Sequence, residues 1–318
     1  MLRYDHLNDH PRDFLAATGL TLAEFALLLP AFEAAYDDLY PPHLTAAGQA
    51  RQRQRGGGAI GGLVDWEDKL LFILVYQKTY PLQTMQGLHF GLSQPQANYW
   101  IHRLLPVVRR ALQTLGMLPE RDASQVATSP LALEGSVLER VIDGTERRRQ
   151  RPQDATRQRD HDSGKKKAHT DKNILVVNET TDKVIYRGPP VAGKTPDKKA
   201  ADEAAIAYPV NATLDKDTGF QGYEPPGVQT RQPRKKPKNK ELSVAERVLN
   251  GLISGVRVVV EHVIAGVKRC RIVKDVLRLT TPGASDLVME IACGLHNLRV
   301  DCRHPAPVFN RQSLLNPA

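Results

Sequence analysis

The sequence has little of what secreted, zinc-binding or membrane-spanning proteins need. It has only 3 cysteines, Cys270, Cys293 and Cys302, and none of them forms a C-x-x-C pair. This pattern indicates a reducing compartment and argues against a zinc site. No stretch approaches the roughly 20 apolar residues of a membrane span, and the first residues lack the apolar core of a secretory signal. We therefore expect a cytoplasmic protein with no membrane partner.

Acidic residues are also in the minority. The chain has 35 Asp and Glu against 44 Lys and Arg, for a formal net charge of +9. Such a surface favours polyanionic partners, nucleic acid above all. Three acids nevertheless stand in or beside apolar runs with basic residues close in sequence: Asp143 in VIDGTE, Asp217 in LDKDTGFQGY and Glu261 in RVVVEHVIAGVK. Carboxylates in basic surroundings suit divalent cations held against DNA, as in two-metal nucleases.

The length of 318 residues is enough for two domains. Residues 1–60 are predicted as a helical segment followed by a linker. Thr21 and Glu24 have the spacing of a capping box before an apolar run. The stretch 51–58 is basic and rich in glycine, which is typical of a loop.

Residues 61–118 predict a compact unit of three helices. The first covers Trp66–Tyr76, and Pro81 opens the second, at a position where a missing N–H costs least. A turn at Gly91 follows, and the capping box Ser93-Gln-Pro-Gln96 begins the third helix.

The third helix has an apolar side and a polar side. Its polar side carries Gln96, Tyr99 and Arg103 as candidates for contacts with DNA. Three helices in this order are typical of a helix-turn-helix DNA-binding domain, and also of a helical packing unit that binds no ligand. The basic chain and the acids downstream favour DNA binding.

After a predicted linker at 119–135, the periodicity changes to alternation over a domain that we place at 136–304, with a tail at 305–318. The predicted elements are strands over 137–143, 173–178, 184–187, 211–214 and 228–232, and helices over 197–207 and 245–270. This order predicts an α/β domain with a mixed sheet and helices on its faces, as in the ribonuclease-H-like fold.

In a ribonuclease-H-like sheet, acids occupy the first strand, the end of the fourth strand and a late helix. Asp143, Asp217 and Glu261 fall in those three places. Their oxygens suit two Mg²⁺ or Mn²⁺ ions. At 100° per residue, Arg257, Glu261 and Lys268 lie within about 40° of one another on a helix. That face could bind metal and phosphate together.

Each acid also has an ordinary structural explanation. Asp143 and Asp217 both stand shortly before a glycine and suit turns. Glu261 can belong to a solvated helix face with an i,i+4 partner. Asp215 and Asp197 are rivals for the second acid, and Asp197, in GKTPDKK, equally suits the N-cap of the helix that follows.

Several segments in a fixed order resemble a known group of proteins. The chain is similar to DDE-superfamily transposases of the Harbinger-like class, found in bacterial insertion sequences. The resemblance covers nearly all of residues 60–304, including the front helices, which resemble the helix-turn-helix of that class. It is carried by VIDGTERRRQRP, SGKKKAHTDKNILV, DTGFQGYEPPGV, PRKKPKNKELS, RVVVEHVIAGVKRCRIVKD and IACGLHNLRV.

The resemblance implies roles for individual residues. The three acids would be the catalytic ligands of two Mg²⁺ or Mn²⁺ ions. Arg257, Glu261 and Lys268 match the family signature Tyr-x2-Arg-x3-Glu-x6-Lys, and Arg257 and Lys268 would contact phosphate. Ser254 stands where relatives have the Tyr, so that position has no assigned role. Asp197 is then structural.

The implied function is transposition. Such an enzyme binds the inverted-repeat ends of an insertion sequence, cleaves a DNA strand and transfers it to target DNA. The expected partners are double-stranded DNA and a second or further copy of the chain, in the bacterial nucleoid. The basic runs 147–159, 165–167 and 231–240, including Lys235 and Lys236, would contact phosphates. A domesticated or regulatory DNA-binding protein that keeps the fold without transposing is the alternative.

Overall fold

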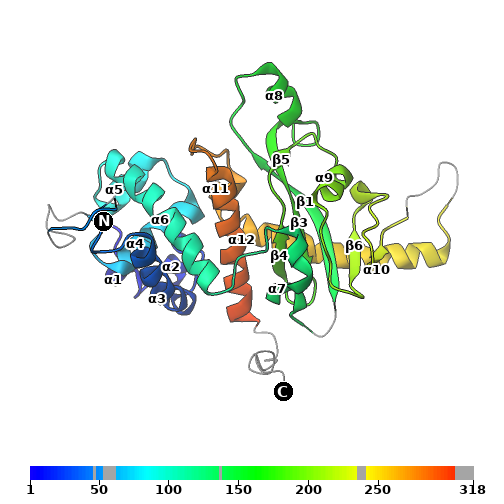
Figure 1. The fold of residues 1–318 in the computed structure, drawn as a ribbon, viewed down its shortest axis with the longest axis horizontal. Helices are drawn as coiled ribbons and strands as arrows, with labels where there is room; N and C mark the ends of the chain where they lie inside the picture. The colour runs from blue at the N-terminus through cyan, green and yellow to red at the C-terminus, as the bar shows by residue number, and fades with distance from the viewer. Residues whose placement is uncertain (46–47, 53–61, 136–137, 235–240, 305–318) are drawn as a thin grey trace. The chain divides into compact units, whose positions relative to one another are not determined.

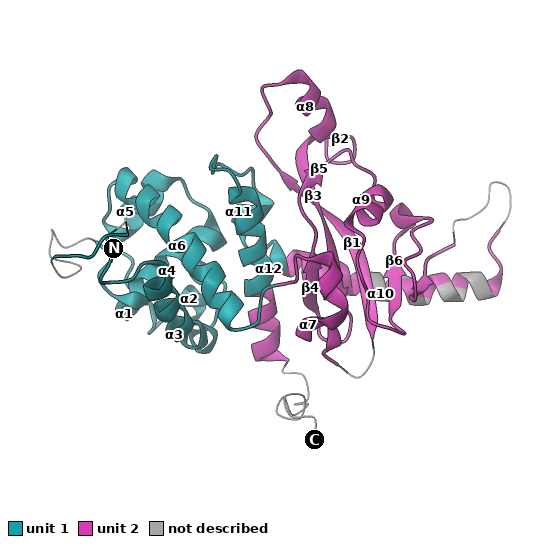
Figure 2. Cartoon of the chain, viewed as in Figure 1, with its two compact units in different colours: residues 1–118, 267–295 teal, residues 119–266, 296–318 magenta. Residues whose placement is uncertain are grey.

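The protein divides into two compact units. One, the helical unit, comprises Met1–Leu118 and Val267–Leu295; the other, the sheet unit, comprises Pro119–Gly266 and His296–Ala318 (Figure 2). The sequence placed all of 136–304 in one domain, whereas Val267–Leu295 joins the N-terminal helices. The structure, a computed structural model, describes residues 1–45, 48–52, 62–135, 138–234 and 241–304.

The helical unit is built around α4, which is buried over Leu70–Tyr76. Both predicted capping boxes are present, at Thr21 with Glu24 and at Ser93 with Gln96. They begin α3 and α6 because each pair satisfies backbone N–H groups that a helix start leaves without partners. The helices are α1 (Tyr4–Leu7), α2 (Pro11–Thr18), α3 (Leu22–Leu39), α4 (Trp66–Thr79), α5 (Gln83–Phe90), α6 (Gln94–Thr114) and α11 (Arg271–Lys274).

Helices α4, α5 and α6 are the three that the sequence predicted. The second begins at Gln83 with Leu82 as N-cap, two residues later than the expected start at Pro81. Gly91 ends it with a left-handed φ of 68°, a conformation that glycine adopts at little cost. The helix-turn-helix arrangement is thus present.

The sheet unit contains the predicted mixed sheet, drawn in green in Figure 1. Strand order is β2-β3-β1-β6-β7, and β4 and β5 also pair with β3. Strand β1 is antiparallel to β3 and parallel to β6, and β6 is parallel to β7. This is a ribonuclease-H-like arrangement. The strands are β1 (Glu139–Arg148), β2 (Asp162–Ser163), β3 (Ala168–Asn178), β4 (Lys183–Arg187), β5 (Val191–Ala192), β6 (Thr213–Lys216) and β7 (Gln229–Arg231).

One face of the sheet carries a core that includes Ile142 and Leu214. Helix α9 (Asp197–Ala204) packs there, together with the 3-10 helix η1 (Ala123–Thr128) and α7 (Pro130–Leu133). The predicted linker at 119–135 is therefore part of this core.

Helix α10 (Val244–Val267) crosses behind the sheet in Figure 1, opposite α7 and α9. It ends at Val267, three residues before the predicted end. Three further helices were not predicted, α8 (Ala155–His161), α11 and α12 (Ala284–Arg303). In α12 the amide of Asn297 bonds the N–H and the carbonyl of Val184 in β4, at 2.8 and 2.9 Å.

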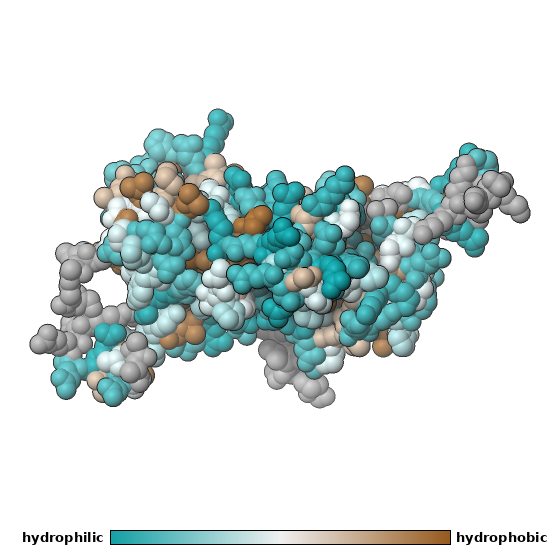
Figure 3. Space-filling view, turned by 90° about the horizontal axis from the view of Figure 1, so that it is seen from above, coloured by the Kyte–Doolittle hydropathy of each residue, from teal (hydrophilic) through white to brown (hydrophobic). Residues whose placement is uncertain are grey.

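Within the described ranges, no single helix is long and apolar enough to cross a membrane, although the bent pair α2 and α3 passes by length and composition. Figure 3 shows a mainly hydrophilic face with hydrophobic residues gathered over part of the helical unit. In α5 and its N-cap, Leu82, Met85 and Leu88 are exposed.

Candidate active site

The register of the sheet brings Asp143 and Asp217 together. The last registered pair of β1 and β6 is Ile142 with Lys216, and the two aspartates are the next residues on each chain segment. Hydrogen-bonded neighbouring strands lie about 4.8 Å apart. Each aspartate accepts a hydrogen bond from the N–H of the following residue, at 2.7 Å for Asp143 and 2.5 Å for Asp217.

The side chain of Asp143 lies on the sheet face that α10 crosses. Successive side chains of a strand alternate between faces, and Ile142 belongs to the core on the α9 face. Asp143 is half-buried there, beside Asp217, which follows β6 directly. A pair of carboxylates is therefore fixed by backbone pairing rather than by flexible loops.

The electrostatics of this pair suit a bound cation. The pKa of Asp143 is raised to about 6, mainly by burial, while the hydrogen bond from Gly144 and the charge of Lys165 lower it. The negative charges of Asp197 and Asp217 contribute to the rise. Oxygen ligands crowded with like charge are what Mg²⁺ and Mn²⁺ take, because the cation relieves the repulsion. The two aspartates thus supply two of the oxygen ligands that a divalent metal needs.

Asp215, one rival for the second acid, is committed to an ion pair. Its side chain is fully buried, and Arg231 of β7 approaches it with Nε at 3.0 Å and Nη2 at 2.5 Å. That hydrogen bond is the main reason why the pKa of Arg231 is raised. Asp215 therefore joins β7 to β6 and contributes to stability.

Asp197, the other rival, lies close to Asp143. It is the first residue of α9, whose N-cap is Pro196, so the N-cap explanation is wrong. Its carboxylate forms an ion pair with Lys172 of β3 at 2.8 Å. The charge of Asp197 also acts on Asp143.

Glu261 stands apart from this pair. It is exposed on α10, and it is not among the charged groups that act on Asp143. Among the residues that the structure describes, no group of three or more His, Cys, Asp or Glu side chains is placed to hold a metal ion. The structure therefore brings two of the three predicted acids together.

The predicted helix face of Glu261 lies in the last part of α10. Lys268 lies in a turn directly after the last residue of α10, so its place on one face with Glu261 stays a prediction. The side chains of Arg257 and Ser254 lie outside the described residues.

Helix α10 is nevertheless tied to the segment beside Asp217. The side chain of Asn250 accepts from the N–H of Arg234 at 2.9 Å and donates to its carbonyl at 3.0 Å. Gln232 donates to the carbonyl of Asp217 at 2.6 Å. No sequence pattern singled out Asn250, because one amide within a helix has no periodic signature.

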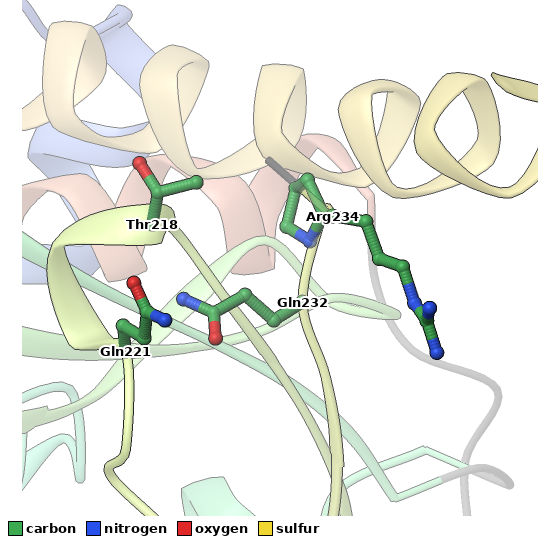
Figure 4. Close-up of a pocket in the computed structure, with 5 residues that line it drawn as sticks. Thr218, Gln221, Gln232 and Arg234 are labelled. Atoms are coloured by element: carbon green, nitrogen blue, oxygen red, sulfur yellow. The ribbon is translucent and has the colours of Figure 1, made fainter. Parts of the chain in front are cut away.

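A cleft of about 350 Å³ lies at the same place, and Figure 4 shows α10 passing beside it. Thr218 and Gln221 come from the turn after Asp217, and Gln232 and Arg234 from the segment after β7. Its lining is polar apart from Pro233 and includes the amides of Gln221 and Gln232 and the side chain of Arg234. Donors of this kind suit phosphate oxygens.

Comparison with known proteins agrees with this geometry. Residues 142–297, from β1 into α12, match a family described as DDE superfamily endonuclease. Residues 62–114, which contain α4, α5 and α6, match a family described as helix-turn-helix of DDE superfamily endonuclease. The chain belongs to the DDE superfamily of endonucleases.

A curated relative of this DDE endonuclease is the "Probable transposase for insertion sequence element IS702" of Microchaete diplosiphon. The two are 26% identical over 198 residues, which are 62% of this chain and 67% of the relative. No solved structure matches the chain.

In the helix-turn-helix of this DDE endonuclease, the three predicted DNA contacts differ in what they already bind. Gln96 accepts the N–H of Ser93 at 2.9 Å in the capping box. Arg103 donates to the hydroxyl of Tyr36 at 2.7 Å and lies 3.7 Å from the ring centre of Tyr40. Tyr99 is 53% exposed. Of the three, Tyr99 is best placed for a partner.

The basic runs of the endonuclease also separate into packed and exposed cations. Arg147 is buried and donates to Asn173 at 3.0 Å, so it is a structural residue rather than the predicted phosphate contact. Lys235 and Lys236 lie outside the described residues. Exposed cations between β1 and β3 are Arg148, Arg151, Arg157, Arg159, Lys165, Lys166 and Lys167.

Proposed function

We propose that this DDE endonuclease is the transposase of an insertion sequence. It binds the inverted-repeat ends of the element, cleaves a strand there and transfers the new 3′ end to target DNA. The observation that carries the proposal is the pairing of Asp143 and Asp217 on adjacent strands of a ribonuclease-H-like sheet. The name of the IS702 relative supports the same class of activity.

Asp143 and Asp217 would hold the divalent metal, with Glu261 as the third ligand. A bound Mg²⁺ or Mn²⁺ pair supplies an activated water and neutralises charge on the phosphate being attacked. The chain orients the ligands through the N–H groups that follow each aspartate. Asn250 holds α10, which carries Glu261, against the segment next to Asp217.

The DNA would be held by three groups of side chains. Tyr99 contacts the duplex from α6, the second helix of the helix-turn-helix motif. Gln221, Gln232 and Arg234 donate to phosphate in the cleft beside Asp217. The exposed cations between β1 and β3, of which Lys165 acts on Asp143, steer the strand toward the acids. Joining two ends requires a dimer or a larger assembly on DNA.

The proposal is tested with a supercoiled plasmid that carries the ends of the element and with Mg²⁺. The full chain should cleave at the ends and leave 3′ hydroxyls. Asp143→Asn should bind the same DNA with unchanged affinity and cleave at least about 10³-fold more slowly, a loss of about 4 kcal/mol in transition-state stabilisation. Asp202→Asn, which alters an exposed acid of α9, is the matched control. Equal cleavage by Asp143→Asn and the wild type would refute the proposal.

The exposed position of Glu261 favours one second candidate, a sequence-specific DNA-binding protein that does not cleave. The same experiment separates the two. Binding of the ends without metal-dependent cleavage, by a wild-type protein that is folded and pure, would select the second candidate.

Helix α6 gives a separate test of DNA binding. Tyr99→Ala should weaken binding to the ends by about 10-fold, or about 1.4 kcal/mol, because its exposed ring is lost from the interface. Arg103→Ala should instead lower the melting temperature, since its guanidinium packs on Tyr36 and Tyr40. Band shifts and thermal unfolding on both variants measure this. An unchanged affinity for Tyr99→Ala would exclude it from the interface.

A further inference from the structure

Two glycines lie close to the aspartate pair, and neither is needed for backbone conformation. Gly144 follows Asp143, and Gly219 stands two residues after Asp217. Neither has the left-handed φ that usually explains a glycine, whereas Gly91 and Gly222 do. Another reason must account for the missing side chains.

That reason is the carboxylate of Asp197. A Cβ added to Gly144 would meet Oδ1 of Asp197 at 2.7 Å, and a Cβ added to Gly219 would meet Oδ2 at 2.8 Å. Real Cβ atoms essentially never approach other atoms within 3.0 Å. The two oxygens of one carboxylate therefore rest against the backbone of both segments that carry the aspartates.

The carboxylate of Asp197 is itself held in place by the ammonium group of Lys172. Lys172 lies 2.8 Å from its Oδ1, and the Lys172 side chain is only 9% exposed. The same ammonium donates to the carbonyl of Thr195 at 2.7 Å. Oδ1 accepts no well-aligned hydrogen bond within the described residues, so the attraction to Lys172 is ionic. A buried cation thus fixes the carboxylate between the two glycines.

We propose that Asp197, held by Lys172, is a positioning residue that sets the spacing between Asp143 and Asp217. This rests on the proposed function, since spacing matters only if the two aspartates share a ligand. The carboxylate acts as a spacer on the far side of Gly144 and Gly219 and does not itself bind metal. Removing it lets the segment after β6 move relative to β1, and the aspartates then lose their common geometry.

Two substitutions separate a spacer from a metal ligand. Asp197→Asn keeps the shape and loses the charge, whereas Asp197→Ala loses both. Mn²⁺ affinity of the full chain without DNA, measured by electron paramagnetic resonance, should fall at least about 10-fold for Asp197→Ala and less than about 3-fold for Asp197→Asn. If Asp197 were a ligand, both variants would lose affinity equally, and that outcome would overturn the proposal.

The glycines provide a second, independent readout. Gly144→Ala should weaken Mn²⁺ binding in the wild type, because its new carbon collides with Asp197. In the Asp197→Ala background the space is open, so Gly144→Ala should add no further loss. Additive losses in this double-mutant cycle would contradict the proposal.

Two control variants keep this result interpretable. Gly188→Ala is the matched neutral control, since its added carbon meets neighbours only at the ordinary distance of 3.5 Å. Gly87→Ala, which places a carbon 2.5 Å from the carbonyl oxygen of Leu92 in the helical unit, should lower the melting temperature and leave Mn²⁺ affinity unchanged. A loss of Mn²⁺ affinity in Gly87→Ala would show that general destabilisation explains the effect.

Failure of the positioning role of Asp197 and failure of the proposed function give different results. If Asp143→Asn binds Mn²⁺ as well as the wild type, the metal site itself is wrong. If Asp143→Asn loses Mn²⁺ and Asp197→Ala keeps it, the metal site stands and the positioning role of Asp197 is refuted.

Discussion

The aspartate pair and Glu261 are positioned by different kinds of structure. Asp143 and Asp217 follow a registered pair of residues on hydrogen-bonded strands, and both carboxylates are fixed by backbone N–H groups. Glu261 lies exposed on α10, a helix joined to the segment after β7 through the side chain of Asn250. The positions of acids on paired strands are set by the backbone hydrogen bonds between the strands. The position of an acid on a helix is set by the side-chain contacts through which that helix packs.

This contrast predicts an order of assembly for the site. The strand pair should bind a first divalent ion without DNA, because its two carboxylates are already adjacent. Glu261 should matter for the second ion and for cleavage. Substitutions at these acids and at their supporting residues test whether the aspartate pair and Glu261 differ in this way.

The largest effect is expected from removing either kind of acid. Asp217→Asn and Glu261→Gln should each reduce cleavage at least about 10³-fold, or about 4 kcal/mol, because both positions are needed for two ions. They should differ in Mn²⁺ binding without DNA, which Asp217→Asn loses and Glu261→Gln keeps. Calorimetric titration of the two variants with Mn²⁺ measures this difference. Equal losses of Mn²⁺ affinity would show that the strand pair and α10 do not differ in binding the first ion.

The next effect concerns stability of the strand that leads to Asp217. Asp215→Asn should lower the free energy of unfolding by about 2–3 kcal/mol, since it breaks the ion pair of a fully buried carboxylate whose partner Arg231 is 35% exposed. Denaturant unfolding measures the change. First-ion Mn²⁺ affinity in the folded variant should stay within about 3-fold of the wild type. A complete loss of Mn²⁺ binding would identify Asp215 as the second acid instead.

A smaller effect is expected from loosening α10. Asn250→Ala removes two hydrogen bonds to the backbone of Arg234, worth about 1 kcal/mol together at this half-exposed site. Cleavage should fall about 5-fold while Mn²⁺ binding without DNA stays unchanged. Gln229→Ala, at an exposed position of β7, serves as control. Unchanged cleavage would mean that α10 is positioned by other contacts.

Much of the fold follows from local sequence patterns. Two capping boxes located the starts of α3 and α6, and short apolar runs located the five principal strands. The short pieces were missed, since η1 and α7 carry too few residues to show periodicity. The end of α10 was misplaced by three residues, so Lys268 lies one residue beyond the helix.

The site was predictable only as far as strand order allows. Knowing that Asp143 ends the predicted first strand and that Asp217 follows the fourth was enough to expect them side by side. The roles of Asp215 and Asp197 could not be separated from sequence, because their partners Arg231 and Lys172 come from other strands. Contacts between distant segments leave no pattern in one sequence.

The most direct test of the two-metal account is the electron paramagnetic resonance spectrum of the full chain with Mn²⁺ and DNA containing the element's ends. Two ions about 3.5–4 Å apart are magnetically coupled and give a spectrum distinct from that of isolated Mn²⁺. The account predicts the coupled signal for the wild type and its loss in Asp143→Asn and in Glu261→Gln. An isolated Mn²⁺ signal in the wild type, or a coupled signal that survives in Asp143→Asn, would contradict it.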